Sequence, residues 1–199
     1  MSTTSQSRTV SDLVVVGKPA AKLSAALEVI GRSLHATFDQ FKALPADYSR
    51  MSCIQSALTT RDYLKACGIK SIVVPVRLVM LITQLGQKQI EYTIGQVEHS
   101  PAVVDIWRGH LVTLCDGFLI DAALYRAARI QPRKLVPMAA VPASRGPSLA
   151  QLSAQGPDFR VDINWSHTPA NTGWMDFDDT RTAILRGLVI KKMLAAKAA

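Results

Sequence analysis

One thiol in the sequence has a context that suits nucleophilic chemistry. Cys53 follows the polar stretch 46–49 and opens a run of helix-spaced apolar residues, so we expect the thiol in the first turn of a helix. Ser52 is a suitable N-cap, Gln55 can complete a capping box, and Gly68 is a suitable C-terminal stop. The free N–H groups and the positive end of the dipole at a helix start favour thiolate over thiol.

An imidazole and a carboxylate lie on the two arms of a predicted β-hairpin. Two strand-like segments are joined by Asp116-Gly117, which is among the strongest two-residue turn signals. The register that continues from this turn places Val112 opposite Asp121. His110 and Asp121 then become diagonal neighbours on one face of the hairpin, within reach of a side-chain hydrogen bond.

These three side chains are the parts of a Cys-His-Asp nucleophilic site. In this interpretation Cys53 is the nucleophile, His110 takes the thiol proton, and Asp121 orients the imidazole and stabilises its charged form. The thiolate would attack an amide or thioester carbonyl and form an acyl-enzyme, which water or an amine resolves. The backbone N–H of Cys53 can supply one oxyanion donor, and the sequence does not identify a second.

The same residues resemble the core of the transglutaminase-like branch of the papain-like cysteine enzymes. The resemblance consists of a cysteine that opens a helix, a strand that begins Gly109-His110, and then Asp-Gly followed by Ile120-Asp121. It covers roughly residues 49–123. Bacterial cysteine peptidases that mature small peptides belong to this branch, and arylamine N-acetyltransferases share the layout.

The resemblance implies an α+β, papain-like fold in which an antiparallel sheet packs against helices and Cys53 lies at a helix N-terminus. It implies a cysteine peptidase or a transglutaminase-like acyltransferase with Cys53, His110 and Asp121 as catalytic residues. A protein or peptide is the expected substrate, and no cofactor or metal is implied.

Other polar residues offer competing interpretations. Asp116 could replace Asp121 as the acid, but a turn carboxylate is expected to point outward. His99 and His167 are imidazoles on predicted loops, and His35 is expected at the surface or boundary of a helix.

The remaining cysteines are internal controls for Cys53. Cys67 is predicted at a helix C-terminus, where the dipole opposes a thiolate, and Cys115 is predicted on the hairpin face away from His110. A metal site built from Cys53, Cys115 and the two hairpin residues is disfavoured, because Cys115 would face the wrong way.

Composition indicates one globular domain and leaves a second class of function open. The chain has 199 residues, of which 48% are apolar, and it carries a net charge of +8. The positive charges are scattered, so no nucleic-acid-binding motif stands out. The alternative function is a non-catalytic module that binds protein or nucleic acid through a basic surface.

No apolar run is long enough to span a membrane, the polar N-terminus has no secretory signal, and three cysteines without CxxC spacing suit a reducing compartment. The sequence therefore predicts a cytoplasmic protein.

Periodicity and turn residues predict the rest of the chain as a single domain over 10–199 after a flexible tail. Pro75 suggests an edge position or a bulge in its strand. The predicted elements are a tail over 1–9, a short edge strand over 10–16, a helix over 20–42, strands over 71–82, 90–97 and 159–165, an irregular Pro/Ala-rich segment over 131–157, and a C-terminal helix from 178.

Overall fold

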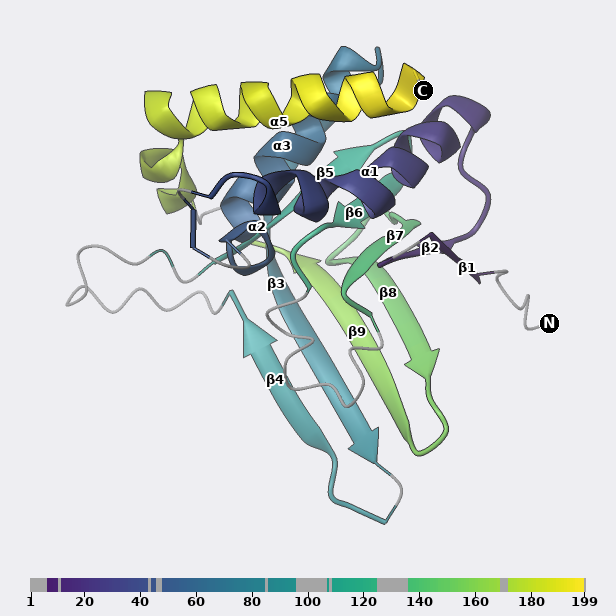
Figure 1. The fold of residues 1–199 in the computed structure, drawn as a ribbon. Helices are drawn as coiled ribbons and strands as arrows, with labels where there is room; N and C mark the ends of the chain where they lie inside the picture. Colours follow the sequence, from purple (N-terminus) through teal and green to yellow (C-terminus); the bar gives the residue numbers. More distant parts are fainter. Residues whose placement is uncertain are drawn as a thin grey trace.

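The computed structural model describes residues 7–10, 12–42, 44–45, 48–84, 86–95, 107, 109–124, 136–168 and 172–198. Within these residues the protein has one nine-stranded sheet and three long helices, which pack on part of one face of the sheet (Figure 1). The α+β class predicted from the sequence is therefore confirmed.

The sheet follows the order β1-β2-β7-β6-β5-β3-β9-β8, with β4 paired to the second half of β3. Neighbouring strands are antiparallel except for β2 and β7, which are parallel. The strands are β1 (Ser7–Val10), β2 (Leu13–Val16), β3 (Ser71–Gln84), β4 (Ile90–Ile94), β5 (His110–Cys115), β6 (Phe118–Asp121), β7 (Met138–Pro142), β8 (Ser148–Gln155) and β9 (Phe159–His167).

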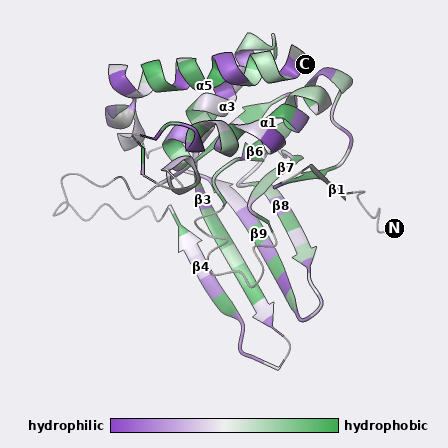
Figure 2. Cartoon of the chain, viewed as in Figure 1, coloured by the Kyte–Doolittle hydropathy of each residue, from purple (hydrophilic) through white to green (hydrophobic). Residues whose placement is uncertain are grey.

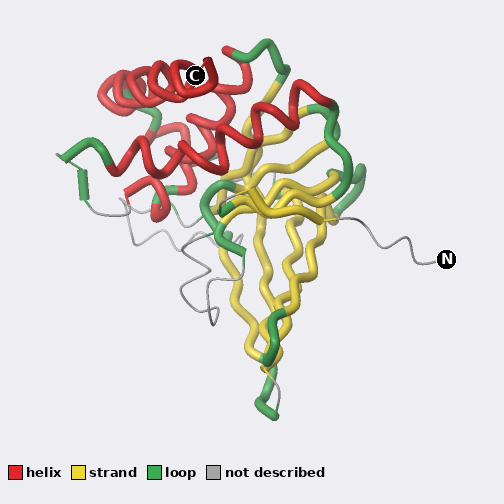
Figure 3. Tube along the Cα trace, turned by 45° about the vertical axis from the view of Figure 1, so that its right-hand side comes forward, coloured by secondary structure: helices red, strands yellow, loops and turns green. Residues whose placement is uncertain are grey.

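The helices gather on the β5–β6–β7 side, whereas β3, β4, β8 and β9 extend beyond them (Figures 1 and 3). A short helix, α2, leads into the second long helix, and a 3-10 turn, η2, leads into the last. The helical elements are α1 (Ala21–Asp39), α2 (Tyr48–Met51), α3 (Cys53–Ala66), η2 (Gly173–Phe177) and α5 (Thr180–Ala198).

The sheet curls, and each of its two faces buries a separate apolar cluster. The outer cluster joins α1 and α5 to the outward-facing residues of the central strands, such as Ile120 and Ala140. The inner cluster joins residues of β5, β6 and β7 to residues of β3, β8 and β9, including Val112, Val161 and Ile163. Strands from both ends of the sheet order therefore meet inside the curl, and apolar and polar positions alternate along the exposed strands (Figure 2).

The hairpin register predicted from Asp116-Gly117 is confirmed. Both turn residues have positive φ, at 44° and 75°, as the tight turn requires. Cys115 pairs with Phe118, and the pairing continues from there through β5 and β6. This register is what places His110 and Asp121 on the same face.

Pro75 lies where β3 changes partners. β3 pairs with β5 over Ser71–Val76 and with β9 over Val76–Gln84, so Pro75 has a registered partner on only one side. A residue without an N–H is tolerated at such a position. The expected edge position is therefore correct locally, although β3 as a whole lies inside the sheet.

The segment predicted to be irregular, 131–157, contains two strands, β7 and β8. The prediction was wrong because the prolines lie at strand boundaries and do not interrupt the strands. Pro142 ends β7 at an exposed position, and Pro147 precedes β8. At the other end of the chain, β1 occupies the last part of the tail expected over 1–9, and residues 1–6 lie outside the described residues.

The C-terminal helix α5 packs on α1 and α3 through Val189 and Met193, which are fully buried. Two other apolar residues of this helix point outward: Leu188 is 48% exposed and Ile184 is 62% exposed. The apolar residues of α5 therefore point both inward and outward, as its mixed colouring indicates (Figure 2).

Candidate active site

Cys53 lies in the first turn of α3, as the sequence predicts. The Ser52 hydroxyl caps the helix by accepting a hydrogen bond from the backbone N–H of Gln55 at 3.2 Å. The Cys53 Sγ is half-buried and lies 3.8 Å from the backbone oxygen of Gly109, the residue before His110. The start of α3 and the start of β5 are therefore in contact.

The capping box predicted at this helix start is only half formed. The Gln55 side chain does not return to Ser52, because its Oε1 lies 3.5 Å from the guanidinium Nη1 of Arg186 in α5. The backbone N–H of Ser52 bonds instead to the carbonyl of Tyr48. Gln55 is thus oriented toward α5, which makes it a poor oxyanion donor.

His110 links the thiol to the carboxylate. Its ring is 2% exposed, and its Nε2–H donates to Asp121 Oδ2 at 2.6 Å. Cys53 is also close enough to affect the pKa of the imidazole, and Nδ1 is the ring nitrogen that Asp121 leaves open. Burial lowers the pKa of His110, but the charges and hydrogen bonds of Asp121 and Cys53 raise it to about 10. The site therefore favours an imidazolium next to the thiol.

Asp121 is fully buried and accepts three hydrogen bonds. Oδ2 accepts from His110 and from the indole Nε1–H of Trp165 at 2.7 Å, and Oδ1 accepts from the backbone N–H of Ala123 at 3.0 Å. These donors give both oxygens of the buried side chain a hydrogen-bond partner. Trp165 was missed as a site residue, although the alternation of β9 predicts that its side chain points inward with Val161 and Ile163.

His35 has a different position from the one expected. It is 5% exposed rather than at the surface, and it connects α1 to both halves of the site. Its Nε2 lies 2.8 Å from the carbonyl of Ala122, and its Nδ1 lies 2.8 Å from the Ser49 hydroxyl. The Ser49 carbonyl in turn accepts from Ser56 in α3. His35 therefore helps to fix the position of α3 relative to the end of β6.

The other competing residues do not join the site in the described structure. Asp116 is an exposed residue of the hairpin turn, as predicted. His167 is exposed at the end of β9, and His99 lies outside the described residues. Cys115 faces the outer apolar cluster, and burial raises its pKa to about 12.

Aromatic residues form one wall beside Cys53. Trp107 and Trp174 pack with Ile54 and Leu111 in a small apolar cluster that Cys53 borders. Gly109 is required there, because a Cβ atom would lie 2.0 Å from the Trp107 ring. The close approach of this indole to the backbone fixes the strand immediately before His110.

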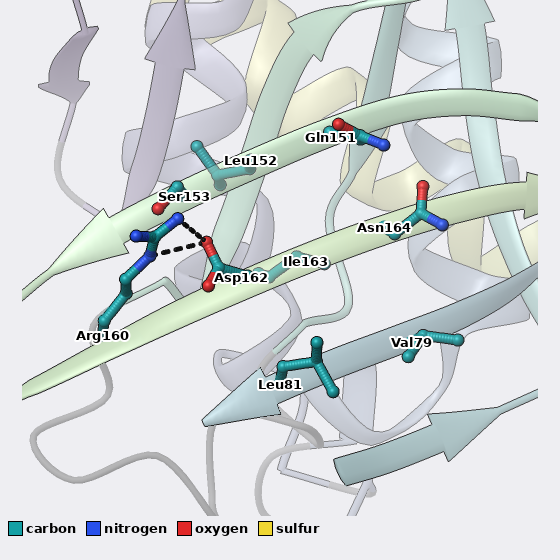
Figure 4. Close-up of a pocket in the computed structure, with 9 residues that line it drawn as sticks. All are labelled: Val79, Leu81, Gln151, Leu152, Ser153, Arg160, Asp162, Ile163 and Asn164. Atoms are coloured by element: carbon teal, nitrogen blue, oxygen red, sulfur yellow. Dashed lines mark hydrogen bonds and ion pairs between the residues drawn. The ribbon is translucent and has the colours of Figure 1, made fainter. Parts of the chain in front are cut away.

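A separate concavity of about 510 Å³ lies on the open face of β3, β8 and β9 (Figure 4). Val79 and Leu81 form part of its floor, and an ion pair between Arg160 and Asp162 lies at one end. None of its lining residues belongs to the Cys53 site, and its charged pair is already neutralised. It offers no reactive group.

No protein-family model, curated protein or solved structure matches the chain. Among the described residues, no helix has the length and apolar character to cross a membrane, and no cluster of His, Cys, Asp and Glu could hold a metal ion. The evidence for a function therefore lies in the geometry around Cys53.

The raised pKa of His110 predicts a specific dependence of stability on pH. Because the folded pKa, about 10, exceeds the usual 6.5, the folded state keeps a proton that the unfolded state loses between these values. The contribution of His110 to the free energy of unfolding should be complete below about pH 6.5 and should disappear as pH rises toward 10. Urea unfolding at pH 6, 8 and 10 is expected to show that the free energy of unfolding falls as pH rises, and that it falls less in His110→Gln. An equal fall in the two proteins would contradict this prediction.

Proposed function

We propose that the protein is a cysteine-dependent enzyme that hydrolyses an amide bond or transfers an acyl group, with a papain-like arrangement of its catalytic residues. The observation that carries the proposal is that the Cys53 thiol contacts the backbone of Gly109, the residue before His110, while the His110 ring bonds to the buried Asp121 carboxylate. Nucleophilic cysteine sites need this order, since the base must contact the nucleophile and be oriented by a third group.

In the proposed reaction the thiol proton has passed to His110, so a Cys53 thiolate lies beside the imidazolium before substrate is attacked. The Cys53 thiolate then attacks the carbonyl carbon, and a C–S bond forms as the carbonyl π electrons move to oxygen. Collapse of this intermediate breaks the C–N bond, and the imidazolium returns its proton to the leaving amine. The thioester acyl-enzyme is then attacked by water or by a second amine, which His110 deprotonates, and the thiol is regenerated.

Several contacts support roles for the individual residues. Asp121 accepts from Nε2–H, which leaves the Nδ1 side of the ring for the thiol proton. The first N–H groups of α3 have no partner within the helix, so the backbone of Cys53 can contribute to an oxyanion hole. A protein or peptide is the proposed substrate, since an amide carbonyl is the group that this chemistry addresses.

Thiol alkylation tests the proposal with two controls in the same chain. At pH 6 an ordinary thiol with a pKa near 8.5 is only about 0.3% thiolate. We expect iodoacetamide to label Cys53 about 10- to 100-fold faster than Cys67, since the proposed reaction passes the Cys53 proton to His110. Buried Cys115 should react more slowly still. Peptide mass spectrometry over time gives all three rates.

His110→Ala should remove the preference for Cys53. Incubation with an activated peptide thioester should give an acylated Cys53 in the unmodified protein and none in this variant. Equal, slow labelling of Cys53 and Cys67 in the unmodified protein would reject the enzyme proposal.

That outcome would favour the alternative, a non-catalytic binding module. Its support is the outer face of α5, where Ile184 and Leu188 are exposed on a helix that also carries Lys191 and Lys192. Retention on DNA that falls steeply with salt would identify a nucleic acid as the partner. A protein that is not retained on DNA at any salt concentration would argue against nucleic acid as the partner.

A further inference from the structure

Trp165 makes a contact with the site that strand order alone would not produce. β9 is separated from β6 by β5 and β3 in the sheet. The Trp165 indole nevertheless reaches Asp121 across the inner cluster, because the sheet curls and the side chain of Trp165 points into the curl. The residue is fully buried, and its N–H has Asp121 Oδ2 as its acceptor at 2.7 Å.

The contact involves the same carboxylate oxygen that holds His110. Oδ2 accepts from the indole and from the imidazole, while Oδ1 is held by the Ala123 N–H. The two non-histidine donors fix both ends of the carboxylate plane. They leave the remaining lone pair of Oδ2 directed at the imidazole, so the ring orientation depends on both of them.

We propose that Trp165 is a positioning residue of the Cys53 site, whose indole N–H fixes the Asp121 carboxylate and moderates its attraction for the His110 proton. This inference rests on the proposed function for its catalytic consequence. An indole N–H is a donor only, and its positive end lies close to the oxygen that faces the imidazole. It therefore offsets part of the negative charge that His110 experiences.

Several ionisable groups lie near His110, and each of them could change the pH at which His110 titrates. Asp121 of β6 bonds to the ring directly, and Cys53 of α3 is the other ionisable group close enough to affect its pKa. His35 of α1 bonds to the carbonyl of Ala122, next to Asp121. His167 of β9 lies in the same row of the sheet as His110, with Val76 between them. Of these residues and Trp165, only Trp165 bonds directly to the Asp121 carboxylate and carries no ionisable group.

Trp165→Phe removes the N–H donor and keeps an aromatic side chain. We expect it to slow the reaction of Cys53 with iodoacetamide at neutral pH about tenfold, a loss typical of one weakened positioning contact. We also expect the His110 titration, followed by ¹⁵N NMR of the imidazole, to move to higher pH. Ile163→Val is the matched control, since it removes one buried methylene from the same face of the same strand. It should change neither value.

A double-mutant cycle separates this role from simple packing. If the indole acts through the carboxylate, Trp165→Phe should have little further effect on the Cys53 rate in a protein that already carries Asp121→Asn. Full additivity of the two changes would overturn the proposal. So would an unchanged His110 titration in Trp165→Phe.

A measurement on the unmodified protein keeps the proposal testable if the variant does not fold. Of the three tryptophan indole resonances, that of Trp165, assigned through its contacts with β9 protons, should exchange slowly with solvent and shift as His110 titrates. If the chemical shift of the Trp165 indole does not change as His110 titrates, the positioning role is rejected. A slow Cys53 reaction in the unmodified protein, combined with a coupled indole signal, would instead reject only the enzymatic function.

Discussion

Replacing Asp121 with asparagine is expected to lower the rate of Cys53 acylation by about 10⁴-fold, the loss seen when a triad acid becomes an amide. The side chain keeps its size, but it loses its charge and one of its two acceptor oxygens. Acylation by an activated peptide thioester, followed by intact-protein mass spectrometry, measures the rate. No substitution elsewhere in the described site should have a larger effect on this rate without removing a reacting group.

The reason is the number of donors that converge on this carboxylate. If the amide oxygen takes the Oδ2 position, it keeps His110 and Trp165 but turns its NH₂ toward the Ala123 N–H. If it takes the Oδ1 position, the NH₂ faces the imidazole and the indole, and His110 must change tautomer. The first orientation sets the NH₂ against one donor and the second sets it against two, and both remove the anion that stabilises the imidazolium.

The stability of the protein should fall as well. Three donors and a fully buried acceptor mean that the lost contacts cannot be replaced by water. We expect the free energy of unfolding to decrease by about 3–5 kcal/mol, the range for breaking a buried charged pair. Urea denaturation at pH 7 gives this value alongside the acylation rate.

The same hairpin offers the control. Asp116→Asn makes the identical chemical change at the exposed turn, where φ is 44° and asparagine is well tolerated. This variant should keep the acylation rate and the stability of the unmodified protein. If the two asparagine variants behave alike, Asp121 is not the orienting acid.

The local features of the site could be predicted because they depend on nearby residues. The Asp116-Gly117 turn fixed the register of β5 and β6, and the alternation of side chains then put His110 beside Asp121. The Ser52 cap and the position of Cys53 depend on one turn of α3. Each of these signals acts over a few residues, within the range in which sequence pattern determines structure.

Trp165 and His35 could not be placed in this way, because their contacts depend on how the sheet curls and how α1 docks. Trp165 is 44 residues from Asp121 in sequence, and His35 is 87 residues from Ala122. The direction of each side chain follows from periodicity, but its partner does not. Similarly, the prolines over 131–157 could not show whether they interrupt strands or mark their ends, which depends on the neighbouring strands.

Replacing Arg186 with methionine is expected to lower the free energy of unfolding by about 2–3 kcal/mol. The Arg186 side chain is 5% exposed in α5, and its Nη2 lies 2.5 Å from Asp178 Oδ1. Its Nε lies 3.6 Å from Asp62 Oδ2 in α3. Methionine would keep the aliphatic packing and remove the close cation of Asp178, whereas Asp62 would keep its ion pair with Arg61 at 2.6 Å. These acids are 28% and 29% exposed and can hydrate in part, so the cost stays below that of a fully buried pair.

The change should also reach the site, because Arg186 donates to Gln55, two residues after Cys53. Loss of this donor frees the first turn of α3 from α5, so Cys53 alkylation should slow by a few-fold at most, much less than in Asp121→Asn. Lys191→Met makes a matched change at an exposed position of the same helix and should alter neither stability nor rate. Urea denaturation of the three proteins measures the difference. Equal midpoints for both methionine variants would mean that other contacts of α5, such as the burial of Val189 and Met193, hold the helix without help from the guanidinium.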